Sequence, residues 1–142
     1  MRTGSPFALL MVDVDQLKRV NDSLSHAAGD AVLVAVSESL LVGSRAMDIV
    51  CRFGGDEFVL IMSGTDAEAA LKRAEELRER AEALTVRLGD LGISISVSIG
   101  VATAPEHGTN AAQLMTAADE ALHVAKESGR NRVEVAAGVH EH

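Results

Sequence analysis

A glycine pair followed by two acids divides an apolar run and predicts a β-hairpin. The segments DIVCRF (48–53) and FVLIM (58–62) are rich in β-branched and large apolar residues, and Gly54-Gly55-Asp56-Glu57 joins them. Two such runs around a short glycine-containing segment are typical of antiparallel strands joined by a turn. Carboxylates are depleted from strands and neighbouring like charges repel, so a purely structural turn does not need both acids. The pair therefore indicates a chemical role at the tip of the hairpin.

Helical and strand patterns account for the chain on either side of this hairpin. The run PFALLMVDVD (6–15) starts apolar and ends in acids, as expected for a central strand whose end opens onto a site. A helix is predicted from Asp30 to the residues before Gly43. A second helix follows the hairpin, with Thr65 and Glu68 as a capping box. Its inward-facing stripe is predicted to be Leu71, Ala74, Leu77, Ala81 and Leu84.

The C-terminal third predicts a strand, a helix and a final short strand. Alternating Ile and Ser in ISISVSIGVAT (93–103) indicates a strand with one buried face. A helix is predicted over 111–126, ended by Gly129, and RVEV (132–135) is the last strand. The order β-α-β-β-α-β-α-β mixes hairpins with crossover helices. It predicts an α+β fold, with a mostly antiparallel central sheet flanked by helices, in one domain over residues 1–142.

Composition limits the classes of function. The 142 residues carry a formal net charge of −8, which argues against binding long nucleic acid but allows a small phosphorylated ligand held with a metal. There is no apolar run of the roughly 18 residues that a membrane span needs and no signal-peptide pattern. We therefore expect a cytoplasmic domain without membrane contact. The single Cys51 is expected to be a small buried side chain, and the tail HEH (140–142) to be solvated.

Asp13 and Asp15 end the first predicted strand, and we expect only one of them to share a site with the hairpin acids. We take strand alternation to place the two on opposite faces, and choose Asp13. If the first strand neighbours the hairpin, Asp13 converges with Asp56 or Glu57, and converging carboxylates need a cation between them. Oxygen ligands favour Mg²⁺ or Mn²⁺. The alternative is that Asp13 caps the next helix and the hairpin acids are exposed turn residues.

The two glycines favour the site over that alternative. A turn without side chains lets a phosphate or nucleoside approach the backbone, and Gly54 and Gly55 provide such a turn directly before the acids.

Four ordered blocks of sequence resemble the GGDEF family of diguanylate cyclases. GGDEF at 54–58 is the family signature, and DVDQLKRVNDSLSHAAGD (13–30) is similar to its D-x-D-x-F-K-x-x-N-D-x-x-G-H-x-x-G-D. SISVSIGVAT (94–103) and AADEALHVAKESGRNRV (117–133) match its strand and final helix. The similarity runs from about Ala8 to Val135. It implies a palm-like fold of the nucleotidyl-cyclase or ferredoxin type, and condensation of two GTP into cyclic di-GMP by a homodimer.

The resemblance also implies roles for individual residues. Asp13, Asp56 and the carbonyl of Val14 would bind Mg²⁺ or Mn²⁺, with Glu57 beside them as a metal or catalytic acid. Further residues would bind the substrate: Lys18, Lys126 and Arg130 the triphosphate, Asn21 and Asp30 the guanine, and Gly54 and Gly55 the approaching nucleotide.

Some of these roles have simpler alternatives. A carboxylate such as that of Asp30 can accept from guanine N1–H and N2–H₂, whereas adenine presents an acceptor at N1. From the residues alone, Asp30 could instead be a helix N-terminal acid. Lys126 and Arg130 could be charges that complement a helix C-terminus.

Arg45 and Asp48 form an R-x-x-D motif, and the five residues Ile49–Phe53 separate it from the GGDEF block. The family has an inhibitory cyclic di-GMP site at this spacing, which implies product feedback. The site often recruits a further arginine, and the sequence does not distinguish Arg73 from Arg78 for this role. The alternative is a loop salt bridge.

The chain also departs from the family pattern. Leu17 replaces a usual Phe, Ser25 a usual Gly and His123 a common Tyr. Family members usually have a helix carrying D-x-L-T-x-L-x-N-R-R, and a sensor domain before it, but only about six residues precede the first strand here. We therefore expect a trimmed domain with weakened activity. The alternatives are an inactive module that binds GTP or cyclic di-GMP as a receptor, and an enzyme that makes another nucleotide.

Overall fold

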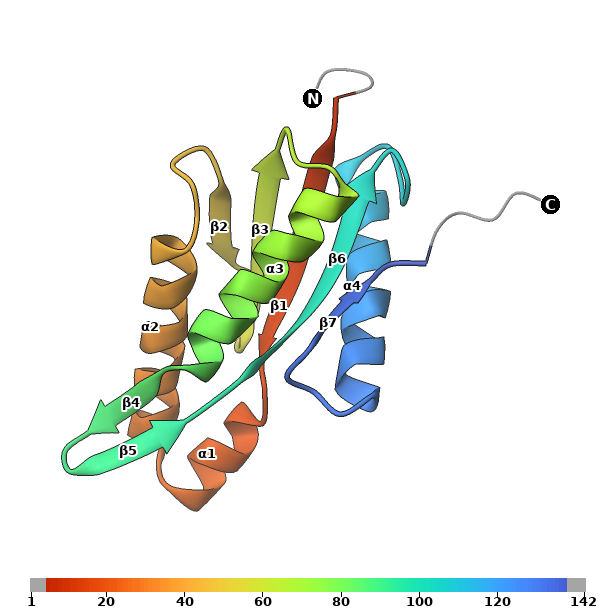
Figure 1. The fold of residues 1–142 in the computed structure, drawn as a ribbon. Coiled ribbons are helices and arrows are strands. Elements are labelled where there is room, and N and C mark those ends of the chain that lie inside the picture. The colour runs from red at the N-terminus through yellow and green to blue at the C-terminus, as the bar shows by residue number, and fades with distance from the viewer. Residues whose placement is uncertain (1–4, 138–142) are drawn as a thin grey trace.

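A computed structural model describes residues 5–137 as a five-stranded sheet with helices on both faces (Figure 1). The sheet order is β2-β3-β1-β6-β7. The central strand β1 (Phe7–Val14) is antiparallel to β3 (Glu57–Ser63) and β6 (Val97–Ala104). At the edges, β2 (Ile49–Arg52) is antiparallel to β3, and β7 (Val133–Val135) is parallel to β6. The predicted α+β class with a mostly antiparallel sheet is confirmed. The tail 140–142 lies outside the described residues.

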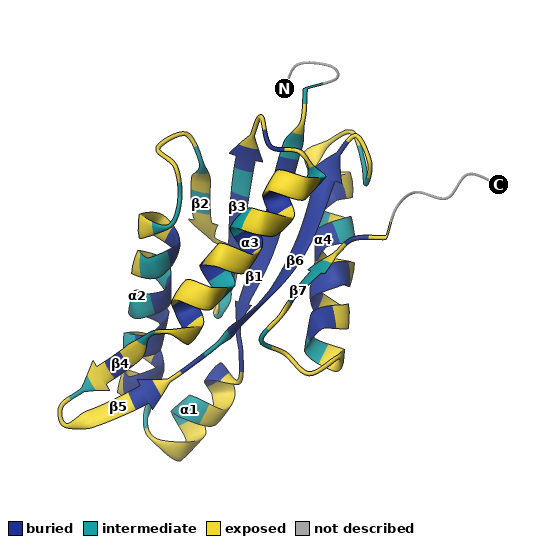
Figure 2. Cartoon of the chain, viewed as in Figure 1, coloured by how far each residue is buried: buried dark blue, intermediate teal, exposed yellow. Residues whose placement is uncertain are grey.

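Two helical layers enclose the sheet. On one face lie α1 (Leu17–Ser23), α2 (His26–Val42) and α3 (Ala67–Glu82), and on the other lies α4 (Ala111–Glu127). Every residue of β6 is buried between the two layers (Figure 2). The prediction that this strand has one buried face is therefore wrong, because helices cover both of its faces.

The predicted hairpin is confirmed as β2 and β3, but Cys51 is exposed. The expectation that this side chain is buried is wrong because β2 lies at the edge of the sheet, where one side of the strand has no neighbour.

The helical segment after β1 begins earlier than predicted. A short helix α1 starts at Leu17, and α2 starts at His26 rather than Asp30. The N-cap of α2 is Ser25, whose side chain accepts a hydrogen bond of 3.0 Å from the backbone N–H of Ala28. This cap satisfies one of the free N–H groups at the start of the helix. The predicted end at Gly43 is confirmed, since Gly43 is the C-cap.

The start and the buried stripe of α3 differ from the prediction. The N-cap is Asp66, which accepts from the N–H of Ala69 at 2.9 Å, so the capping box at Thr65 is wrong. Ala70 is buried whereas Leu71 is 40% exposed. The buried face consists of three alanines and Leu77, and Leu71 lies outside it.

A second, two-stranded sheet that was not predicted from the sequence is formed by β4 (Thr85–Leu88) and β5 (Leu91–Ser94). The segment read as one strand over 93–103 changes partner: Ile93 pairs with Val86, whereas Val97 pairs with Val14. The helix predicted over 111–126 is confirmed as α4, which ends before Gly129 at a positive φ of 122°. Across residues 5–137, the helices are all too short or too polar to cross a membrane.

Candidate active site

Pairing between β1 and β3 brings Asp13 to the acids of the hairpin. Asp13 is directly opposite Glu57 in the antiparallel register, and the N–H of Val14 donates to the carbonyl oxygen of Asp56 at 3.0 Å. The predicted convergence of these carboxylates is confirmed. The alternative that Asp13 caps the next helix is wrong, because the N-cap of α1 is Gln16.

The buried carboxylate of Asp13 is only partly satisfied by hydrogen bonds and ion pairs in the described region. The residue is 4% exposed and forms an ion pair with Lys126 of α4, while its Oδ1 has no hydrogen-bond partner in the described part of the chain. Burial raises the pKa of Asp13 to about 7; Lys126 opposes this shift, and the nearby Asp56 adds to it. Burial would lower the pKa of Lys126, but Asp13, Glu57 and Asp56 together raise it. The site therefore holds more negative charge than Lys126 compensates.

This donor set fits a divalent cation whose remaining ligands come from a substrate. Within residues 5–137, no three His, Cys, Asp or Glu side chains are grouped closely enough to hold a metal by themselves. Mg²⁺ is usually held by one or two carboxylates together with substrate phosphates and water, so such a group is not required. The buried, unpartnered Oδ1 of Asp13 beside Asp56 is the feature that calls for a cation.

Asp15 is separated from this group, but not for the predicted reason. Residues two apart in a strand lie on the same face, so the expectation that alternation puts Asp13 and Asp15 on opposite faces is wrong. The carboxylate of Asp15 is instead occupied by the hydroxyls of Ser96 and Ser98 and by the backbone N–H of Asn131. None of these partners was identified from the sequence.

The hairpin turn has an open side and an internal support. Neither Gly54 nor Gly55 has a positive φ, so their backbone conformation does not require glycine. A Cβ added to Gly55 would meet nothing within 4 Å, so open space surrounds it. Arg52, for which no role was predicted, donates to the carbonyl oxygens of Gly54 at 3.2 Å and Gly55 at 2.6 Å. A basic residue two positions before the glycine pair was the available signal.

A pocket of about 330 Å³ lies between α2 and the hairpin. It is lined by Asp30 and Leu33 of α2 and by Arg52 and Phe58 of the hairpin strands, among others. Asp30 lies inside α2 rather than at its start, so its interpretation as a helix N-terminal acid is wrong. Asn21 is adjacent: a Cβ on Gly29 would lie 1.7 Å from its Oδ1. Asp30 thus lines this pocket, whereas Asn21 contacts α2 at the neighbouring Gly29.

The other predicted substrate cations lie at the ends of helices. Lys18 is exposed on α1, and Lys126 is in the last turn of α4. Arg130 is exposed in the turn that follows α4. Of the three residues that depart from the family pattern, Leu17 is buried, Ser25 caps α2, and His123 is exposed beside Glu127.

The R-x-x-D motif forms a closed ion-pair cluster just before β2. The side chain of Asp48 is fully covered; it accepts from the backbone N–H of Arg45 at 2.7 Å and from its guanidinium at 3.0 and 3.1 Å. Arg73 of α3 adds an ion pair to Asp48 at 2.8 Å, whereas Arg78 pairs with Glu75 and Glu82. Burial would raise the pKa of Asp48, but hydrogen bonds from Arg73 and Arg45 outweigh it and lower the pKa.

The structure thus identifies Arg73 as the arginine next to the motif. Its Nη1 is buried and has no hydrogen-bond partner in the described region. The salt bridge between Arg45 and Asp48 is present, as the simpler alternative required, but that alternative does not account for the unpartnered donor of Arg73.

Comparison with known proteins identifies relatives over most of the chain. A family model described as "Diguanylate cyclase, GGDEF domain" matches residues 1–132. Diguanylate cyclase DosC of Escherichia coli K12 is 39% identical over 135 residues, which cover 94% of this chain and 29% of DosC. The chain thus spans less than a third of the length of that relative.

Solved structures share the fold. The GGDEF domain of Pseudomonas aeruginosa PA1120 (YfiN or TpbB) matches with a TM-score of 0.90 at 36% identity, covering 95% of this chain and 84% of that one. The GGDEF domain of DgcB from Caulobacter crescentus, solved in complex with c-di-GMP, matches with a TM-score of 0.86 at 29% identity, covering 93% and 78%.

Proposed function

The chain belongs to the GGDEF family of diguanylate cyclases, and from this membership we propose that it condenses two GTP molecules into cyclic di-GMP, with release of two pyrophosphates. The observation that carries the proposal is the buried carboxylate of Asp13, which lies beside the hairpin acids and has an oxygen without a partner in the described region. A site that only stabilised the fold would be expected to satisfy that oxygen.

The chain's own carboxylates would hold a divalent metal. GGDEF cyclases generally use such ions, and here Asp13 and Asp56 would bind Mg²⁺ or Mn²⁺, with the carbonyl of Val14 as a further ligand and Glu57 beside them. When bound, the ion would neutralise phosphate charge and lower the pKa of the attacking ribose 3′-hydroxyl.

The remaining residues bind and orient the nucleotide. Glu57 would take the proton of the 3′-hydroxyl. Lys18, Lys126 and Arg130 hold the triphosphate, to which a guanidinium can donate two parallel hydrogen bonds. Asn21 and Asp30 bind the guanine edge, and the open side of Gly54 and Gly55 leaves space for the nucleotide next to the backbone.

Catalysis in this scheme needs a homodimer. Each domain binds one GTP, and the 3′-hydroxyl of one nucleotide must reach the α-phosphorus of the other. Two domains therefore face each other across their hairpins, with both nucleotides between them.

We also propose product feedback at the R-x-x-D motif, with Arg45, Asp48 and Arg73 as its residues. The specific observation in its favour is the buried Nη1 of Arg73, a free donor beside a carboxylate that already has several partners. Arginine can stack on guanine and donate to phosphate, and Asp48 holds both Arg45 and Arg73 at this surface, so the cluster suits cyclic di-GMP.

Chromatography of the nucleotides formed from GTP and Mg²⁺ tests the activity. We expect cyclic di-GMP from the wild type, and at least a roughly hundredfold lower rate from Asp56→Ala, the scale seen when one electrostatic group is removed from an active site. Asp90→Ala, in the exposed turn between β4 and β5, is the matched control and should keep the wild-type rate. Binding of GTP or cyclic di-GMP without any turnover would instead establish a receptor.

A further inference from the structure

We propose that Asp15 is a positioning residue: its buried carboxylate fixes the turn after α4 and thereby presents Arg130 to the triphosphate. The inference rests on the proposed function, because it takes the triphosphate as the ligand of Arg130. It concerns a residue that does not itself contact the nucleotide or the metal in the proposed mechanism.

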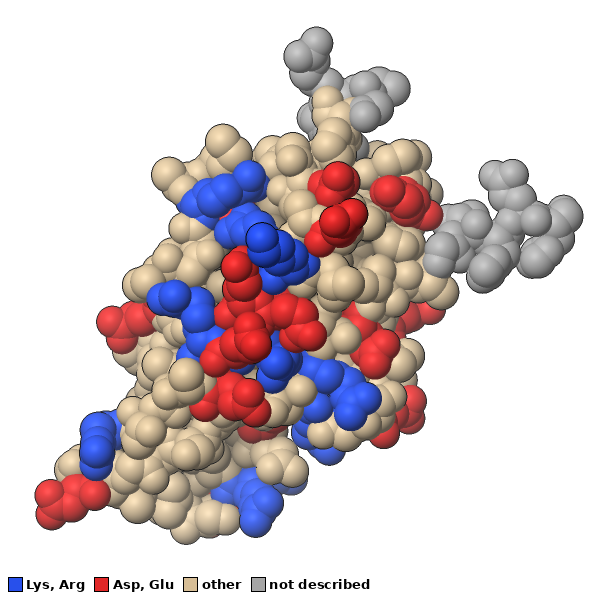
Figure 3. Space-filling view, viewed as in Figure 1, with Lys and Arg blue, Asp and Glu red and all other residues tan. Residues whose placement is uncertain are grey.

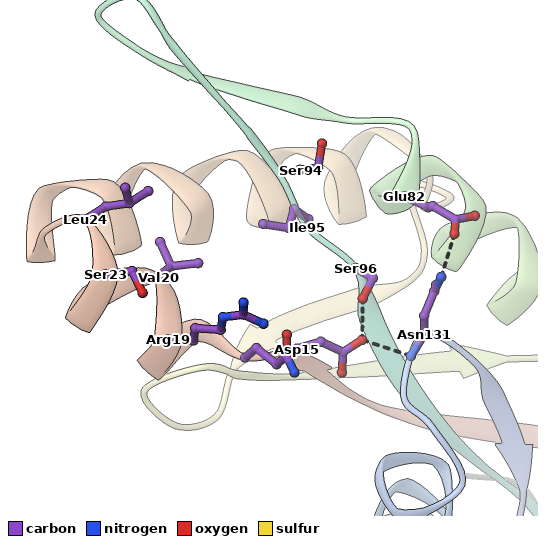
Figure 4. Close-up of a pocket in the computed structure, with 11 residues that line it drawn as sticks. Asp15, Arg19, Val20, Ser23, Leu24, Glu82, Ser94, Ile95, Ser96 and Asn131 are labelled. Carbon is purple, nitrogen blue, oxygen red and sulfur yellow. Dashed lines mark hydrogen bonds between the residues drawn. The ribbon is translucent and has the colours of Figure 1, made fainter.

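The carboxylate of Asp15 is buried and its partners come from two distant segments (Figure 4). It is 8% exposed. The hydroxyls of Ser98 and Ser96 donate to Oδ1 and Oδ2, each at 2.6 Å, and the backbone N–H of Asn131 donates to Oδ2 at 3.0 Å. Within the described residues, no ion pair joins Asp15 to a Lys or Arg. A buried carboxylate is costly unless it is hydrogen-bonded, so the carboxylate of Asp15, held by the two serines, requires the N–H of Asn131 at a defined position.

The turn held by Asp15 has an unusual backbone conformation. Gly129, Arg130 and Asn131 have φ values of 122°, 60° and 45°, so two non-glycine residues follow one another in the left-handed region. That conformation is common for asparagine but unfavourable for arginine, and at Arg130 it persists when the surroundings impose it. The hydrogen bond from Asn131 to Asp15 is such a constraint, and it acts on the residue next to Arg130.

The side chain of Asn131 holds the turn from its other side. Its Oδ1 accepts from Arg78 at 2.9 Å, and its Nδ2 donates to Glu82 at 2.5 Å. Both partners belong to α3, and Figure 3 shows acidic and basic side chains gathered over this helix. The turn is thus tied to β1 through its backbone and to α3 through a side chain.

The end of β1 therefore sets the position of α4 and its turn at two points. Asp13 pairs with Lys126, and Asp15 binds Asn131, on the same face of the sheet. Arg130 lies between these two anchors in the chain. Loss of the hydrogen bond between Asp15 and Asn131 would leave Lys126 in place. The guanidinium of Arg130 would then no longer be held in the orientation that binds the triphosphate.

Two probes separate this role from a general contribution to stability. The first is 3′-deoxy-GTP, which has the triphosphate but lacks the hydroxyl needed for condensation, and the second is guanosine, which has no phosphate. For Asp15→Ala we expect about tenfold weaker binding of 3′-deoxy-GTP, the loss expected for one charged hydrogen bond. Binding of guanosine should be unchanged, because the pocket at Asp30 does not involve the turn.

Hydrogen exchange at the amide of Asn131 provides a readout that needs no nucleotide. In Asp15→Ala this amide loses its acceptor and should exchange at least about tenfold faster. Asp15→Asn keeps one carbonyl oxygen as an acceptor and should fall between wild type and Asp15→Ala in both measurements. Asp15→Asn also allows both measurements to be made if Asp15→Ala does not fold. The control Asp90→Ala should behave as wild type throughout.

The outcomes distinguish this inference from the proposed function. If the wild type binds neither probe, the proposed function fails and the positioning role fails with it. If the wild type binds both probes and the Asp15 variants bind 3′-deoxy-GTP equally well, only the positioning role is overturned. Equal weakening for both probes, or unchanged exchange at Asn131, would also overturn it, because either result describes a residue that does not act on the turn.

Discussion

The side chains of Asp13 and Asp48 are both covered, but the pKa of Asp13 is raised whereas that of Asp48 is lowered. Asp48 accepts hydrogen bonds from two arginines and a backbone N–H, and these lower its pKa despite burial. Asp13 has Lys126, a second acid nearby and an oxygen without a partner in the described region, and burial raises its pKa to about 7. The protein completes the environment of Asp48 by itself, whereas the environment of Asp13 is incomplete without a ligand.

The difference shows how a buried carboxylate can indicate either structure or function. Buried polar groups in native proteins are almost always satisfied, and the exceptions concentrate at sites that act on a ligand. At the R-x-x-D cluster, the unsatisfied atom is on Arg73 rather than on the acid. The two regions therefore predict ligands of different kinds: a cation with a nucleotide at Asp13, and a hydrogen-bond acceptor at Arg73.

The largest expected effect separates the two aspartates by activity. Asp13→Asn should lower cyclic di-GMP synthesis by roughly hundredfold or more, because it removes a metal-binding charge. Asp48→Asn should retain synthesis, since Asp48 belongs to the other cluster. Initial rates of pyrophosphate release with saturating GTP and Mg²⁺ measure both. An equal loss of synthesis rate in the two variants would show that Asp13 and Asp48 do not have separate roles in catalysis and regulation.

A second test concerns the two arginines of α3. Arg73→Ala should weaken cyclic di-GMP binding by about tenfold or more, the loss expected for one charged hydrogen bond, while Arg78→Ala should leave it unchanged. The reason is that Arg73 contacts Asp48, whereas Arg78 pairs with Glu75 and Glu82. Calorimetric titration with cyclic di-GMP measures the affinities. If neither variant loses affinity, the cluster at Asp48 is a structural salt bridge.

The pH dependence of stability should have opposite signs at the two aspartates. The pKa of Asp13 is raised from 3.8 to about 7, so folded protein binds more protons between these values, and its free energy of unfolding falls as pH rises through them. The pKa of Asp48 is lowered from 3.8, so its contribution is present above 3.8 and is lost as pH falls through the lowered value.

Urea unfolding with a chelator present measures both signs in metal-free protein. The stability of Asp13→Asn relative to wild type should increase from about pH 4 to pH 7, the window set by the raised pKa of Asp13. Asp48→Asn should be less stable than wild type over that whole range. If Asp13→Asn instead lost free energy of unfolding relative to wild type as the pH rose, the raised pKa of Asp13 would be contradicted.

The smallest effect is expected at the open side of the hairpin. Gly55→Ala should change the free energy of unfolding by less than about 0.5 kcal/mol, because the added Cβ meets nothing within 4 Å and the φ of Gly55 is not positive. It should nevertheless weaken binding of 3′-deoxy-GTP if that space accommodates the nucleotide. Unchanged affinity, measured by the same titration, would mean that the glycine serves neither the fold nor the ligand.

Local patterns predicted most of the secondary structure. Two β-rich runs around Gly54-Gly55 became β2 and β3, the apolar stripe located α3, and the stop at Gly129 marked the end of α4. Errors arose where two patterns overlapped or where the environment was non-local. Thr65 and Asp66 are both good N-caps, and only the geometry selects Asp66. Cys51 has an apolar neighbourhood in sequence, but its strand is at the edge of the sheet.

Local sequence specifies the chemical groups of the candidate site and the hairpin that carries two of its acids. Those features are local, since Gly54 to Glu57 are consecutive and a turn is set by its own residues. Which groups meet depends on the packing of distant segments. Asp15 binds a residue 116 positions away in the chain, Asp13 pairs with Lys126, and Asp48 is reached by Arg73 rather than Arg78. Such contacts depend on strand order and on which faces the helices cover, and no local pattern contains that information.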